Sequence, residues 1–194
     1  MEYVSRFGMS VAENWHVWLV SVVLIAAAVI DGIKLKVPNW LTFPFILSGW
    51  LFSVAWFAWN GEPWWHGLAW SLFGTAVGLG LLLPLYAIGG MGAGDVKLLM
   101  GVGAWVHGAV TFNAFCVSAM VGAVLALLLV AVRGNWLRHY VQFWMILGEI
   151  ASVRDPVQLA ERAAQRKSAM LLLPYGIPIA VGTILYFAWT GMLA

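Results

Sequence analysis

The hydrophobic pattern of the chain consists of long apolar runs separated by short polar stretches. A helix needs about 20 apolar residues to cross a hydrocarbon core of ~30 Å. Five runs approach or reach that length, and each is predicted to form a membrane-spanning helix. The predicted spans are Trp15–Ile30, Trp40–Trp59, Gly67–Ile88, Val110–Val132 and Met170–Trp189.

A sixth apolar piece lies between Asp95 and Val106 and is shorter than the others. About 12 residues make only ~18 Å of helix at 1.5 Å per residue. The letters "VHGA" that follow resemble a tight turn into the next span, so we predict a sixth, short helix here. If it reaches the far interface near His107, Asp95 must lie below the near surface, in a thinned or water-filled part of the membrane.

Composition supports an all-α, polytopic membrane protein with about six transmembrane helices. The chain is 63% hydrophobic and 9% charged, whereas a soluble domain carries roughly 25% charged residues. Its 13 tryptophans also fit, because Trp concentrates at membrane–water interfaces. We predict one membrane-embedded domain over residues 1–194, with the first span retained and not cleaved as a signal. The net charge of +2 argues against nucleic acid as a partner, and the lone Cys116 excludes an intrachain disulfide and a Cys-rich zinc site.

Basic residues predict the orientation of these spans. With six spans, both termini lie on one side, and cytoplasmic loops carry the excess of Lys and Arg. The loops after spans one, three and five hold nine of the ten cations, and the opposite side holds Arg6 alone. Both termini are therefore predicted to be extracytoplasmic. Asp31, which ends the first span, and Asp95, which begins the fourth, then both lie at the cytoplasmic face.

The segment 134–168 between spans five and six is the remaining polar part of the chain. Its first half, "NWLRHYVQFWMILGEI", is aromatic and only partly charged, which is typical of a helix lying in the interface. Its second half starts with Asp155 as an N-cap and Pro156 at the first helical position. We predict a cytoplasmic or interfacial amphipathic segment, and its role stays open.

Two carboxylates at membrane depth indicate function, because such groups are costly unless they are protonated, paired or hydrated. Brought together, Asp31 and Asp95 would share one proton and could act as general base and general acid, as in aspartic peptidases. Plainer explanations remain open. Asp95 could serve only as a helix N-cap, and Asp31 could be an interfacial residue that balances Lys34 and Lys36.

A different class of function, a small proton-coupled transporter or relay, could also use two intramembrane acids. Broken helices and glycine-rich segments are compatible with it. However, no inverted repeat is visible, and both acids are predicted at one face instead of along a path. The four histidines show no ligand spacing, so we expect no metal site and no cofactor.

Three separated motifs resemble the type IV prepilin peptidase family. "GAGD" at Gly92–Asp95 is similar to that family's G-x-G-D motif, and Asp31 with "VPNWLT" at Val37–Thr42 is similar to the first catalytic aspartate and the stretch after it. "LPYGIPIAVG" at Leu173–Gly182 resembles the P-Y-G segment of the last span. The resemblance implies an intramembrane aspartic endopeptidase of the cell inner (plasma) membrane that removes the basic leader of a prepilin or pseudopilin after a glycine, at the cytoplasmic face.

By the motif match, Asp31 and Asp95 would be the catalytic acids of this metal-independent reaction. The other residues in the matching motifs are expected to support them. These are Gly92, Gly94, Lys97, Pro38, Asn39, Tyr175 and Gly176.

The chain also departs from the large, bifunctional members of that family. Those carry a cytoplasmic domain with two C-x-x-C pairs, which is absent here. The sequence therefore looks like the short, peptidase-only branch, typified by the tight-adherence (Tad/Cpa, Flp-type) pilus peptidase, without N-methyltransferase activity. A signal-peptide-peptidase or presenilin-like protease shares only the dyad, since Ile30 stands where those proteins have tyrosine. The sequence names neither the substrate, nor the residues that bind the leader, nor the oligomeric state, nor whether the dyad is assembled without substrate.

Overall fold

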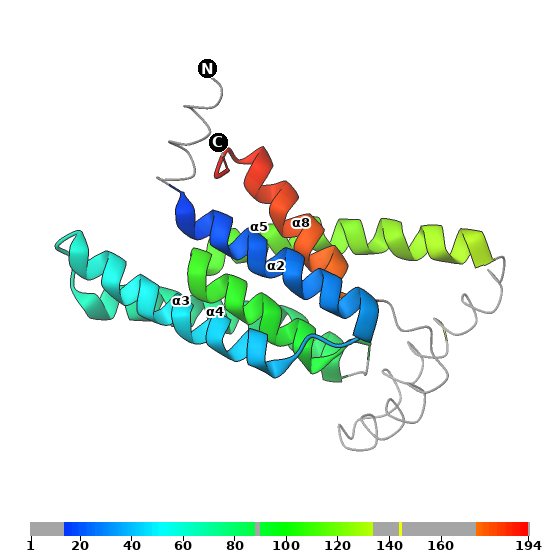
Figure 1. The fold of residues 1–194 in the computed structure, drawn as a ribbon, viewed down its shortest axis with the longest axis horizontal. Coiled ribbons are helices and arrows are strands. Elements are labelled where there is room, and N and C mark those ends of the chain that lie inside the picture. Colours follow the sequence, from blue (N-terminus) through cyan, green and yellow to red (C-terminus); the bar gives the residue numbers. More distant parts are fainter. Residues whose placement is uncertain (1–13, 88–89, 134–143, 145–173, 194) are drawn as a thin grey trace.

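The computed structural model describes residues 14–87, 90–133, 144 and 174–193, and the elements of these ranges are helices. The predicted all-α fold is confirmed for this part of the chain. Consecutive helices run in opposite directions through one bundle (Figure 1). By length and composition, the first four could each cross a membrane, and the last is a shorter apolar helix. They are α2 (Trp15–Lys34), α3 (Asn39–Trp59), α4 (Trp64–Ala87), α5 (Ala93–Arg133) and α8 (Gly176–Trp189).

Helix α5 is two helices joined at a sharp break. His107 has φ 63° and ψ 179°, a conformation that side-chain-bearing residues rarely adopt. Residues 93–106 form a first arm, and residues 108–133 form a second arm that runs back past α8 (Figure 1). The predicted short helix and turn are confirmed here. The turn is held by a hydrogen bond of 2.9 Å between His107 Nε2 and Ser53 Oγ, and the Thr111 hydroxyl donates to the His107 carbonyl at 2.6 Å.

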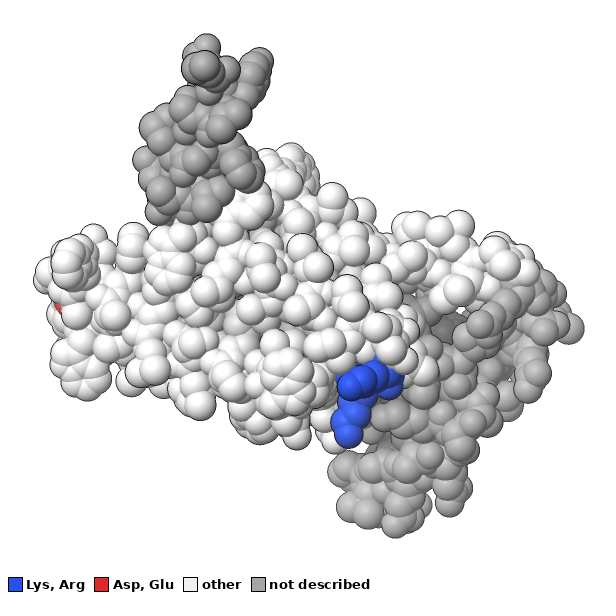
Figure 2. Space-filling view, viewed as in Figure 1, with Lys and Arg blue, Asp and Glu red and all other residues white. Residues whose placement is uncertain are grey.

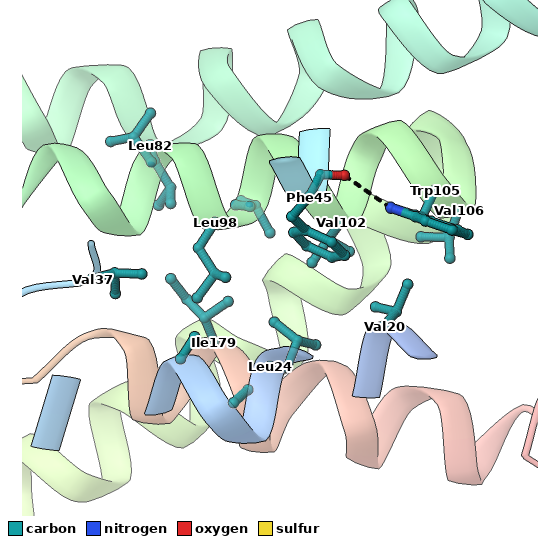
Figure 3. Close-up of a cluster of buried hydrophobic side chains, with 14 of the residues drawn as sticks. Val20, Leu24, Val37, Phe45, Leu82, Leu98, Val102, Trp105, Val106 and Ile179 are labelled. Atoms are coloured by element: carbon teal, nitrogen blue, oxygen red, sulfur yellow. Dashed lines mark hydrogen bonds between the residues drawn. The ribbon is translucent and has the colours of Figure 1, made fainter. Parts of the chain in front are cut away.

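The first arm of α5 lies at the centre of the bundle. Leu98, Leu99 and Val102 on this arm are fully buried, and side chains of α2, α3, α4 and α8 pack around them (Figure 3). The indole of Trp105 donates to the Phe45 carbonyl of α3 at 2.9 Å. Because every other described helix contacts α5, its first arm fixes the position of the residues at its start, Asp95 among them.

Small residues let α4 and α5 approach closely. A Cβ added to Gly74 would overlap the backbone of Gly103, and a Cβ on Gly103 would overlap Gly74. A Cβ on Gly78 would lie 2.6 Å from the Leu99 carbonyl oxygen. Contacts of this kind are typical of helices that pack inside membranes, where close van der Waals contact replaces the hydrophobic effect.

The surface of the described bundle is that of a membrane protein. Large apolar side chains point outward along several helices, for example Val22, Leu51 and Met120. Lysines gather at one end, near the connection between α2 and α3 (Figure 2). The opposite end shows a small acidic spot, where the turn between α3 and α4 carries Glu62 (Figure 2). The number of six spans and the side on which the termini lie stay predictions, and the segment 134–168, apart from Trp144, lies outside the described residues.

Candidate active site

Asp31 lies on the buried side of α2, one turn before the helix ends. It continues the buried stripe of Val20, Leu24 and Ala27, because residues three or four apart share a helix face. Only 2% of Asp31 is exposed. Its Oδ2 accepts a hydrogen bond of 2.8 Å from the Gly176 amide. The reading of Asp31 as a plain interfacial residue therefore does not fit its position.

Gly176 is the first residue of α8, so its amide has no partner within that helix. The Asp31 carboxylate satisfies this amide and lies at the positive end of the helix dipole. A Cβ at position 176 would lie 2.9 Å from Asp31 Oδ2 and 3.0 Å from Asp31 Cβ. The space between α2 and α8 thus admits only glycine without a shift of the carboxylate.

Asp95 occupies the first turn of α5 and is 6% exposed. Its Oδ2 accepts a hydrogen bond of 3.1 Å from the Gly92 amide, and its own amide donates to the Gly92 carbonyl at 3.2 Å. Because α5 begins at Ala93, Asp95 is not the N-cap residue that the sequence suggested but the third residue of the helix. Its bond from the Gly92 amide is the half of a capping box that this position supplies, and it fixes the carboxylate beside the glycine turn while the side chain stays buried.

Gly94 brings the start of α5 against the connection between α2 and α3. A Cβ on Gly94 would lie 2.6 Å from the carbonyl oxygen of the buried Val37 and 3.0 Å from its Cβ. Since Val37 is six residues after Asp31, this contact places Asp95 at the same end of the bundle as Asp31. Val37 begins the Val37–Thr42 stretch of the resemblance. Its backbone role was missed, because a sequence carries no signal for a carbonyl group that contacts a glycine.

Lys97 fastens α5 to the first turn of α3. Its Nζ donates to Asn39 Oδ1 at 2.9 Å and lies 4.6 Å from the centre of the Phe43 ring. Pro38, in extended conformation, caps the start of this helix. The structure thus brings Pro38, Asn39 and Lys97 together beside the glycine turn. Phe43 was not selected from the sequence, although it lies one turn after Asn39 on the same helix face.

Tyr175 and Gly176 are neighbours in the chain at the start of α8. Gly176 is hydrogen-bonded to Asp31, so Asp31 lies beside the start of α8. The contact of Gly94 with Val37 puts Asp95 at the same end of the bundle, although the two acids are 64 positions apart in the sequence. All nine residues selected from the sequence lie in this one region of the described structure.

Comparison with known proteins gives the family. A match to the type IV leader peptidase family extends over residues 18–127, which is more than half of the chain and includes Asp31 and Asp95. The chain belongs to the type IV leader peptidase family. The family resemblance of the motifs is therefore confirmed, while membership of the Tad/Cpa branch stays a prediction.

Two curated relatives in this family carry the name prepilin leader peptidase/N-methyltransferase. The protein of Aeromonas hydrophila is 30% identical over 138 residues, which are 66% of this chain and 45% of the relative. The protein of Aeromonas salmonicida (strain A449) is 31% identical over 124 residues, 60% of this chain and 40% of the relative. The chain thus spans less than half the length of these leader peptidase relatives. No solved structure matches the chain.

The arrangement in this leader peptidase family member suits acid–base chemistry. Two carboxyl groups in one water-poor site do not both ionise easily, so such a pair holds one proton between them. The ionised member can take a proton from water, and the protonated member can donate to a carbonyl oxygen. Gly92 keeps side-chain bulk away from the Asp95 carboxyl group, and Gly176 keeps it away from that of Asp31, since an added Cβ would lie 3.2 Å and 2.9 Å from the respective Oδ2 atoms.

Proposed function

We propose that the protein is an intramembrane aspartic endopeptidase in which Asp31 and Asp95 cut a prepilin or pseudopilin after the terminal glycine of its basic leader. The observation that carries this proposal is the placement of two buried acids at the same end of the bundle, with Asp31 hydrogen-bonded to the first residue of α8. Of the three acidic residues that the structure describes, these two are buried, and the third, Glu62, is exposed. The names of the curated relatives support a prepilin as the substrate.

The reaction needs only water and the two carboxyl groups. One carboxylate takes a proton from a water molecule, and the water oxygen bonds to the carbonyl carbon of the scissile peptide. The protonated carboxyl group gives its proton to the carbonyl oxygen, which yields a tetrahedral diol. The diol then collapses as its C–N bond breaks. The amine nitrogen takes a proton from the dyad, one diol hydroxyl returns a proton to the dyad, and a new carboxyl terminus is left on the leader.

The site is proposed to face the cytoplasm. Lys34, Lys36 and Lys97 lie at the same end of the bundle as the two aspartates, and cytoplasmic ends of membrane proteins carry the excess of cations. A basic leader would reach the dyad from this side, while the apolar part of the substrate stays in the bilayer. With this orientation, we propose that the protein lies in the cell inner membrane, where a cytoplasmic leader can reach the site.

Methyl transfer is proposed to be absent. The connection between α2 and α3 has only four residues, 35–38, and Cys116 is the single cysteine of the chain. The C-x-x-C domain that the resemblance associates with the bifunctional members has no counterpart here. We therefore propose a peptidase-only enzyme that resembles the Flp-type branch.

The test is co-expression with a prepilin from the same genome, followed by mass spectrometry of the new N-terminus. We expect loss of the leader after its glycine, with no added methyl group. Asp31→Asn and Asp95→Asn should each lower cleavage at least 1,000-fold (an order-of-magnitude expectation), because an amide can neither take nor give the proton. Their thermal unfolding in detergent should stay within a few degrees of wild type. Residual cleavage above this level in one variant would remove that residue from the dyad.

A further inference from the structure

A shallow apolar groove runs along the outside of the bundle between α2 and α8. It encloses about 430 Å³. Its α2 wall includes Ile25, Ala28, Val29 and Gly32, and its α8 wall includes Ile177 and Val181. Along each helix the lining positions recur at i, i+3, i+4 and i+7, so each wall is one continuous face of its helix.

One end of this groove lies level with Asp31 and Gly176. Gly32 directly follows Asp31 in the chain, and Ile177 directly follows Gly176. The Asp31 carboxyl group itself lies on the buried side of α2, where the hydrogen bond from Gly176 joins the two helices. A Cβ on Gly32 would lie 3.6 Å from Ile177 Cδ1, so the walls are within van der Waals distance there. A helix lying in the groove would thus end at the level of Asp31.

The form of the groove fits a helix. The α2 wall from Ile25 to Ile33 covers eight residue steps, or ~12 Å at 1.5 Å per residue, which is about two helical turns. Ala28 and Gly32 contribute little side-chain bulk, which permits the close approach of another helix. An extended peptide would need hydrogen-bond partners for its backbone inside the hydrocarbon, whereas a helix brings its own.

We propose that the groove between α2 and α8 binds the apolar helix that directly follows the scissile bond of the substrate. This inference rests on the proposed function, because that function requires a substrate whose cut lies at the end of an apolar segment. The helix packs against Val29 and Val181, and its first peptide bond then lies at the level of Asp31. The groove selects substrates by length and apolar character, while the dyad performs the cut.

Cleavage kinetics test the proposal. Val29→Trp and Val181→Trp fill the groove, and each should lower kcat/KM for the full-length prepilin at least tenfold, mainly through KM. The matched control is Val124→Trp on the second arm of α5, because Val29 is 56% exposed and Val124 57% exposed. The control should stay within twofold of wild type. Equal kcat/KM values for the groove variants and the control would overturn the proposal that the groove binds the substrate helix. Failure of wild type itself to cleave would instead reject the proposed function.

Crosslinking supplies a second readout that does not depend on turnover. In an Asp95→Asn, Cys116→Ser background, Val29→Cys should form a disulfide with cysteines scanned along the apolar helix of the prepilin. The yield should rise and fall with a period near 3.6 residues, as expected for a helix. Val124→Cys is the control and should stay unlinked. A disulfide between two copies of the chain, or no link at position 29, would overturn the proposal and assign the groove to self-association or to lipid.

Discussion

Two glycines near the aspartates, Gly94 and Gly176, have no room for a side chain because other atoms of the protein lie against them. Gly176 faces the Asp31 carboxylate, and Gly94 faces the Val37 backbone. In both places another part of the chain occupies the space that a Cβ would need. This gives a physical reason for the second glycine of the G-x-G-D motif and for the glycine that follows Tyr175 at the start of the last helix.

Gly176→Ala tests this reading. The added Cβ would lie 2.9 Å from Asp31 Oδ2, a distance that requires the carboxylate or the start of α8 to shift. We expect kcat/KM for prepilin cleavage to fall at least tenfold, because catalytic groups misplaced by a fraction of an ångström lose much of their effect.

The matched control for Gly176→Ala is Gly80→Ala in α4, where no atom lies within 4 Å of the added Cβ. Alanine is favoured over glycine in a helix interior by about 1 kcal/mol, so this variant should retain full activity and unfold at the same or a higher temperature. Unchanged cleavage by Gly176→Ala would show that Asp31 does not depend on its contact with α8.

At the scale of elements, the break in α5 determines the depth of Asp95. Its first arm has only 14 residues, 93–106, which give ~21 Å of helix. Ser53 and Thr111 hold His107 at the far end of this arm, while Lys97 and Asn39 hold the near end. A short arm fixed at both ends keeps Asp95 at one height relative to Asp31.

The backbone of His107 predicts an unusual order of stabilities. Its φ of 63° and ψ of 179° lie in a region that is essentially restricted to glycine and costs other residues about 1–3 kcal/mol. Both His107→Ala and His107→Gly lose the bond to Ser53, but only glycine relieves the strain. We therefore expect His107→Gly to be more stable than His107→Ala by about 1 kcal/mol in thermal or denaturant unfolding, the reverse of the order at ordinary helix positions. The ordinary order would show that the turn straightens in the variant.

The sequence was sufficient for the helices that the structure describes and for the selection of two acids that prove to be buried, because apolar length and charge are local properties. The short helix before His107 followed from its length, and Asp31 and Asp95 followed from their place among apolar runs. The partner of Asp31 could not be predicted, since Gly176 is 145 residues away and meets it only through the packing of α2 against α8. The groove was missed for the same reason: each of its walls is an ordinary apolar helix face until the two helices lie side by side.

At the scale of the whole molecule, the lysines that the structure describes lie at the same end of the bundle as the two buried aspartates. The exposed Lys36 belongs to the connection between α2 and α3, beside the dyad, and the exposed Glu62 belongs to the opposite turn between α3 and α4. The exposed apolar surface between them is suited to lipid. A site at the basic end can meet a basic leader only if that end is cytoplasmic, so orientation and activity are linked.

Cysteine labelling in intact cells tests this orientation. In a Cys116→Ser background, Lys36→Cys should react with a membrane-impermeant maleimide only after the inner membrane is opened, whereas Glu62→Cys should react before. Both positions are exposed, so differences in labelling report the side of the membrane and not burial. Removal of Glu62 costs only its contact of 3.6 Å with His66, a surface pair worth at most about 1 kcal/mol. The reverse labelling pattern would place Asp31 and Asp95 outside the cytoplasm, and a cytoplasmic leader could then not reach them without first crossing the bilayer.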